Sequence, residues 1–77
     1  MMTLKIQSWS EHHRLFDCDL DGIDIKISQS SLVQQITRCN MFIVIPIHTN
    51  DETIKLVKEL YEEAQLHIAA RYQEEEY

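Results

Sequence analysis

The residues of this sequence with the clearest potential for chemistry are three aspartates at alternate positions followed by a glycine: Asp17, Asp19, Asp21 and Gly22. Alternating carboxylates and a glycine at a sharp turn form the first half of a calcium-binding loop, which ends with a bidentate acid at position twelve. Position twelve is Ser28 here, and position eight, which should be apolar, is Asp24. We therefore expect no metal site. A small ion-binding module that uses these three aspartates is the weakest of the three functions considered for this chain.

A β-hairpin explains the same residues without an ion. Apolar and polar residues alternate on both sides of Asp21-Gly22, the dipeptide that a two-residue type I′ turn favours because both positions need a positive φ angle. This turn places six apolar residues on one face, in three cross-strand pairs: Leu20–Ile23, Cys18–Ile25 and Phe16–Ile27. On the other face Asp17 pairs with Lys26, whereas Asp19 pairs with Asp24, a like-charge contact that is unfavourable. The sequence therefore predicts an acidic hairpin tip, which is either simply solvated or binds Arg and Lys side chains of another molecule.

The histidines and cysteines lack the spacing of a metal or catalytic site. No histidine lies four residues from another or at zinc-like spacing from a cysteine pair; the four are His12, His13, His48 and His67. Cys18 faces inward in the expected hairpin, and a buried thiol is a poor nucleophile. Without a secretory signal, two thiols are favoured over a disulfide between Cys18 and Cys39. We expect no catalytic residues, no metal, no cofactor and no enzymatic activity.

The chain is acidic, with thirteen Asp and Glu residues against seven Lys and Arg residues and a net charge of −6. Binding to DNA, RNA or an anionic membrane surface depends on basic clusters that neutralise phosphates, and the sequence has none. The longest apolar run has seven residues, whereas a membrane-spanning helix needs about 20. No secretory signal is visible at the start of the sequence. We therefore expect a cytoplasmic protein that contacts neither nucleic acid nor membranes directly.

Hydrophobic patterns predict six elements in the order βββαβα. The expected strands cover residues 3–9, 15–20, 23–28 and 41–47, and the expected helices cover 31–39 and 51–73, followed by a frayed tail at 74–77. We predict a single small α+β domain over residues 1–77, with an antiparallel-to-mixed four-stranded sheet and both helices packed on one face. The second helix is expected to be about 34 Å long, which is enough to overhang so small a domain.

Two expectations concern the faces of the sheet. The apolar run at 41–47 predicts a strand buried on both faces, around which the rest of the chain is organised. The alternation of residues 3–9 directs Trp9 away from Leu4 and Ile6, onto the same open face as Phe42 and Val44. Large apolar side chains on an open sheet face indicate a contact surface. The alternative is that one helix or the N-terminal segment covers them within the monomer.

The helix starts are predicted from capping residues. Ser31 with Gln34, and Thr49 with Glu52, both match the capping box, in which a hydroxyl and a later Glu or Gln satisfy the first backbone N–H groups. Ser30 is an alternative cap for the first helix. We therefore interpret Ser30 and Ser31 as helix caps and not as catalytic nucleophiles.

A small acidic chain without site chemistry is better suited to occupying a surface than to turning over a substrate. We expect a non-enzymatic protein that binds, and inhibits or modulates, a partner protein through the partner's basic surface. Where that partner binds nucleic acid, carboxylates would stand in for phosphates. Small blockers of host enzymes encoded by phages or plasmids have this size and acidity.

The residues expected to contact the partner are the hairpin aspartates, two aromatic residues and three glutamates of the second helix: Asp17, Asp19, Asp21, Asp24, Trp9, Phe42, Glu59, Glu62 and Glu63. The alternative function is a homodimeric structural or regulatory subunit. Such a dimer would pair through the open sheet face or through the long helix.

Overall fold

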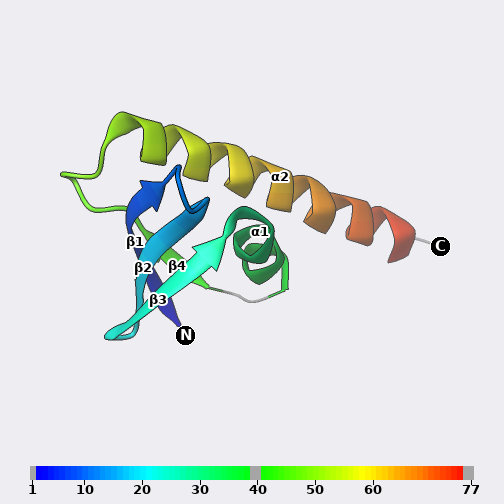
Figure 1. Ribbon diagram of the computed structural model, residues 1–77. Coiled ribbons are helices and arrows are strands. Elements are labelled where there is room, and N and C mark those ends of the chain that lie inside the picture. Colours follow the sequence, from blue (N-terminus) through cyan, green and yellow to red (C-terminus); the bar gives the residue numbers. More distant parts are fainter. Residues whose placement is uncertain (1, 39–40, 76–77) are drawn as a thin grey trace.

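The structure is a computed structural model that describes residues 2–38 and 41–75, with side chains described as far as Arg71. Its elements are β1 (Thr3–Ser10), β2 (Leu15–Leu20), β3 (Ile23–Ser28), α1 (Gln29–Arg38), β4 (Phe42–Val44) and α2 (Asp51–Glu75), as Figure 1 shows. The strands form one mixed sheet in the order β3-β2-β1-β4, in which β4 runs parallel to β1 and the other neighbours are antiparallel. The predicted α+β class and βββαβα order are therefore confirmed.

One hydrophobic core joins the sheet to both helices. Its buried members come from β1, β2, β3, α1 and α2: Leu4, Ile6, Phe16, Cys18, Ile27, Leu32, Val33, Ile36, Val57, Leu60 and Ala64. Inward residues alternate along the strands and recur every three or four positions along the helices, as the two backbone geometries require. Because α1 and α2 contribute to the same cluster, they cover the same face of the sheet and leave its other face open to solvent.

The predicted hairpin is confirmed residue by residue. Strands β2 and β3 pair in the expected register, with Phe16 opposite Ile27, Cys18 opposite Ile25 and Leu20 opposite Ile23. The turn residues Asp21 and Gly22 have φ angles of 50° and 91°, so both lie in the region that a type I′ turn requires.

A β-bulge in β1 overturns the predicted position of Trp9. Ile6 pairs with Cys18, but Ser8 already pairs with Asp17, so β1 contains one residue more than β2 at this point. The extra residue shifts the alternation, and Trp9 lies opposite Phe16 on the covered face, where it packs against the core. The prediction that Trp9 lies on the open face was therefore wrong, because strict alternation assumes a strand without a bulge.

The prediction of a seven-residue strand buried on both faces was also wrong. β4 contains only three residues and lies at the edge of the sheet, where Phe42 is 58% exposed and Ile47 is fully exposed. After β4 the chain turns towards α2, with the Thr49 N–H donating a 3.0 Å hydrogen bond to the Pro46 carbonyl. Because both helices cover the other face of the sheet, no described element packs on the outer face of β4.

Both helices begin differently from the prediction. α1 starts at Gln29, two residues before the predicted start, because its cap is Ser28 and not Ser30 or Ser31. The Ser28 hydroxyl accepts the Ser31 N–H at 3.2 Å. α2 starts at Asp51 as predicted, but its cap is Asn50 rather than Thr49; the Asn50 side-chain oxygen accepts the Thr53 N–H at 2.8 Å. α1 ends at Arg38, and the expected end at residue 39 lies outside the described residues.

α2 extends beyond the body of the domain, as Figure 1 shows. Its 25 residues correspond to about 37 Å of helix, in a molecule with extents of 44 × 24 × 22 Å. Ala64 is the last of its described side chains to be buried, although the helix continues to Glu75. The predicted overhang is therefore present. Residues 74 and 75 are helical rather than frayed, and residues 76 and 77 lie outside the described part of the chain.

Candidate functional site

The carboxylates of the hairpin are mostly engaged within the chain. Asp17 forms a 2.8 Å ion pair with Lys26 and accepts a 3.3 Å hydrogen bond from the Ser8 hydroxyl. The hydrogen bond from Lys26 is the main reason that the pKa of Asp17 lies below its ordinary value. Asp17 therefore stabilises the hairpin in its ionised form.

The two aspartates nearest the turn support the turn itself. The Asp19 carboxylate accepts the Gly22 N–H at 2.7 Å, and the Asp21 carboxylate accepts the Thr3 N–H at 3.1 Å. In the register of the sheet, Asp19 lies between Lys5 of β1 and Asp24 of β3. Within the described residues, Asp24 is the one hairpin aspartate whose carboxylate has no hydrogen bond or ion pair.

These contacts argue against the calcium interpretation. The segment that would form an ion-binding loop is strand β2 and its turn, and its carboxylates accept hydrogen bonds from different donors. Among the described residues no group of three or more His, Cys, Asp and Glu side chains is placed to hold a metal ion.

The negative charge of the chain is concentrated in its C-terminal part. Residues 1–50 contain five acids and four bases, a net charge of −1, whereas residues 51–77 contain eight acids and three bases, a net charge of −5, which together give −6. Counted by element, residues 51–75 contain seven acids and three bases, a net charge of −4, and residues 15–28 contain four acids and one base, a net charge of −3. Both α2 and the hairpin therefore contribute to the acidic surface that composition predicts.

An acidic ridge runs along the outer face of α2 and consists of Glu59, Glu62, Glu63 and Leu66. These residues are spaced at i, i+3, i+4 and i+7, which places them on one face of a helix. All four are exposed, and Leu66 has 73% of its surface accessible. The structure thus brings three of the predicted glutamates together around an apolar side chain that the sequence analysis did not single out.

The other predicted contact residues do not join this ridge. Figure 1 shows the β2–β3 turn at the end of the sheet remote from α2. Phe42 is exposed at the β4 edge, and Trp9 lies on the covered face. Phe42 and Val44 pair with Thr3 and Lys5, on the face opposite the buried Leu4, whereas Trp9 does not share that face with them.

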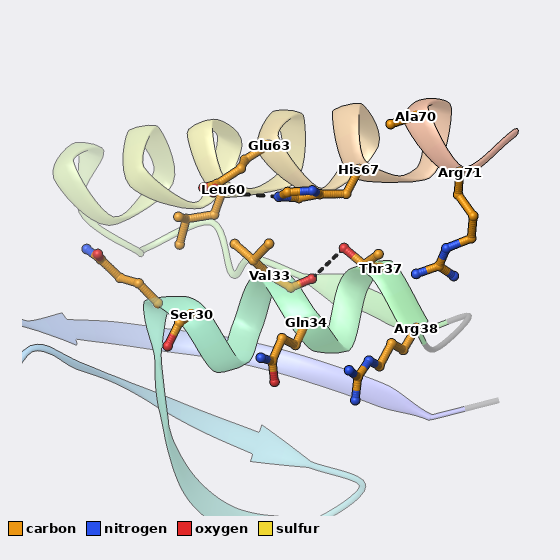
Figure 2. A pocket seen from close by; sticks show the side chains of 11 residues that line it. Ser30, Val33, Gln34, Thr37, Arg38, Leu60, Glu63, His67, Ala70 and Arg71 are labelled. Carbon is orange, nitrogen blue, oxygen red and sulfur yellow. Dashed lines mark hydrogen bonds and ion pairs between the residues drawn. The ribbon is translucent and has the colours of Figure 1, made fainter. Parts of the chain in front are cut away.

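Grooves lie on both sides of α2. One lies beside β4 and is lined mainly by apolar side chains: Met41, Phe42, Ile43, Ile45, Val57, Lys58, Tyr61 and Glu62. The other lies between α1 and α2 and contains Arg38, Arg71 and His67 (Figure 2). His67 is exposed in this groove, with Nε2 3.9 Å from a Glu63 carboxylate oxygen.

The α1–α2 groove was missed in the sequence analysis. Its only signal in the sequence is that polar side chains recur every four residues on both helices. They are Ser30, Gln34 and Arg38 on α1 and Glu63, His67 and Arg71 on α2. This spacing acquires meaning only once the two helices are known to lie side by side.

Cys18 is a free, buried thiol, as predicted. Burial, with a smaller contribution from the negative charge of Asp17, raises the pKa of Cys18 to about 11. The thiol is therefore protonated at neutral pH and shielded by the core, and the geometry offers no route to nucleophilic chemistry at this residue. Cys39 lies outside the described residues.

No protein-family model, curated protein or solved structure matches this chain. None of the helices that the structure describes has an apolar stretch long enough to cross a membrane. The functional conclusion therefore depends on the geometry and charge of the surface alone.

Proposed function

We propose that this chain is a non-enzymatic binding protein that inhibits or modulates a partner protein by docking on the partner's basic surface. The acidic ridge of α2 is the proposed contact. The observation that carries this proposal is the exposure of Glu59, Glu62, Glu63 and Leu66 on one face of a helix that packs on the core through its opposite face.

The composition of the ridge suits a contact with Arg and Lys. Carboxylates accept charge-assisted hydrogen bonds from guanidinium groups, and opposite net charges raise the association rate. Leu66 lies beside these glutamates with 73% of its surface exposed, and this apolar surface would be buried on binding. Where the partner binds nucleic acid, the ridge would compete for the Arg side chains that contact phosphates.

The hairpin aspartates have a smaller part in this proposal. Three of the four already accept hydrogen bonds within the chain, and the turn lies far from α2. A partner that contacts the ridge would therefore reach the hairpin only if it were large.

The test uses two double variants with the same change in charge. Glu59→Lys with Glu62→Lys reverses the ridge, and Asp19→Lys with Asp24→Lys reverses the hairpin. Proteins captured by the tagged chain are identified, purified and measured against each variant in a binary binding assay at low and high salt.

We expect the ridge variant to lose binding and the hairpin variant to keep most of it. Binding of the unchanged chain should weaken as salt rises, because exposed charges are screened. Equal binding by the wild-type chain and the ridge variant, or affinity that does not depend on salt, would contradict the proposal.

A homodimeric subunit is the second candidate function. It is supported by the apolar groove beside β4, where Phe42 is 58% and Tyr61 is 48% exposed. Light scattering tests it directly: a dimer that Phe42→Ser with Tyr61→Ser converts to a monomer would support this function, and a monomeric wild-type chain would exclude it.

A further inference from the structure

The groove between α1 and α2 has a charge opposite to that of the chain as a whole. Arg38 of α1 and Arg71 of α2, two of the three arginines in the sequence, both line it. Within the described residues neither arginine forms an ion pair. Figure 2 places both side chains at the same end of the groove. In a protein with a net charge of −6, this is a local concentration of positive charge among the described side chains.

The helix dipole accounts for only part of this arrangement. The C-terminal end of α1 carries a partial charge of about −0.5, which Arg38 in its last turn already offsets. Arg71 comes from the other helix and adds a full positive charge at the same place. Glu63, the one acid of the groove, lies beside His67 and away from the two arginines in Figure 2.

The groove is elongated rather than cup-shaped. Ser30, Gln34 and Arg38 follow one another along α1, and the first and last of them are about 12 Å apart along the helix axis. His67 and Arg71 follow one another along the facing side of α2. Polar groups at regular intervals along a groove suit a ligand that is itself a chain.

Apolar atoms lie between these two polar rows. Val33 of α1, with Leu60 and Ala70 of α2, contributes to the wall of the groove. The Thr37 hydroxyl is already used, because it donates a 2.8 Å hydrogen bond to the Val33 carbonyl. A ligand that matches the groove therefore has an apolar side and carboxylates that reach the arginines.

We propose that this groove binds an acidic amphipathic peptide segment of a second partner protein, with Arg38 and Arg71 holding its carboxylates. Guanidinium groups bind carboxylates through paired hydrogen bonds, so two of them can fix both the position and the direction of such a segment. The groove shares Glu63 with the acidic ridge, but its arginines require a ligand of the opposite charge. This proposal therefore does not depend on the proposed function.

The probe is a short synthetic peptide with Glu and Leu at helical spacing, added to the ¹⁵N-labelled intact chain and followed by NMR. We expect shifts of the amides of the second half of α1 and of residues 63–71. Arg38→Gln with Arg71→Gln should weaken binding by about tenfold or more. The matched control, Lys55→Gln with Lys58→Gln, removes two charges from α2 outside this groove and should leave the affinity unchanged.

Two further arms identify the ligand class. A peptide with Lys in place of Glu should not bind, and inorganic phosphate alone should not reproduce the shifts. The proposal is overturned if the acidic peptide causes no shifts or shifts other residues. It is equally overturned if the two double variants bind alike, or if phosphate alone binds as tightly as the peptide.

Discussion

Trp9 packs against Phe16 with their ring centroids 4.6 Å apart and their ring planes at 49°, on the face of the sheet that the helices cover. This contact exists because β1 contains an extra residue between its pairs with Cys18 and Asp17. The bulge moves the single tryptophan of the chain from a surface to the edge of the core. Trp9 and Phe42, which sequence alternation places together, therefore have different roles.

Substitution separates these two aromatic residues. Trp9→Ala is expected to lower the free energy of unfolding by about 2–4 kcal/mol, because it removes a large ring packed on the core. Phe42→Ala should cost less than about 1 kcal/mol, because most of that ring is already exposed. Chemical denaturation of both variants measures the difference, and equal losses would contradict the placement of Trp9.

The turn between β2 and β3 is expected to be sensitive to residue type at Gly22. Gly22→Ala should cost about 1 kcal/mol through backbone strain alone, because φ is +91° while an added Cβ meets no atom within 4 Å. Gly22→Asn is the control and should cost less, since asparagine adopts positive φ more readily. Thermal denaturation compares the two variants. An alanine variant as stable as wild type would show that the turn is not type I′.

The ion pair of Asp17 with Lys26 predicts a weak acid dependence of stability. The pKa of Asp17 is lowered from 3.8 in the folded chain, so its contribution is present above that value and is lost as pH falls below it. Both side chains are substantially exposed, and the expected contribution is a few tenths of a kcal/mol.

Denaturation curves of wild type and Asp17→Asn between neutral and acidic pH measure this contribution. The two free energies of unfolding should differ at neutral pH and converge once Asp17 is protonated in the wild-type chain. A constant difference at all pH values would instead assign the effect to the Ser8 hydrogen bond or to packing. High salt should reduce the difference.

Cys18 predicts an alkaline dependence with the opposite sign. Its pKa is raised from 9.0 to about 11 in the folded chain, so the unfolded chain ionises first. Stability is therefore full below pH 9.0 and falls as pH rises from there towards about 11. The free energy of unfolding is measured against pH for the Cys39→Ser variant and for the double variant Cys18→Ser with Cys39→Ser. The difference between the two variants isolates the contribution of the Cys18 thiol.

The same Cys39→Ser variant tests the burial of Cys18 by its reactivity. A thiol-modifying reagent should react slowly with the folded chain at neutral pH and rapidly in denaturant, because the sulfur is covered by the core and is protonated. Fast modification without denaturant would show that β2 is not held against the helices as described.

The sequence by itself determined the elements whose cause is local. Asp21-Gly22 requires positive φ angles that few residue types supply, and the alternation around it admits one register. The 3.6-residue period of α2 likewise predicts which side chains face outward, so the exposure of Glu59 and Glu62 follows from spacing. In each case the residues that decide the structure are neighbours along the chain.

Only the tertiary structure decided which surfaces these elements form. The bulge in β1 depends on how that strand meets β2, and the short, exposed β4 depends on both helices covering one face of the sheet. Lys5 lies opposite Asp19 of the hairpin because β1, and not another strand, lies beside β2. The groove of Arg38 and Arg71 requires α1 and α2 to be adjacent, and the four-residue spacing of polar side chains on each helix does not reveal that adjacency.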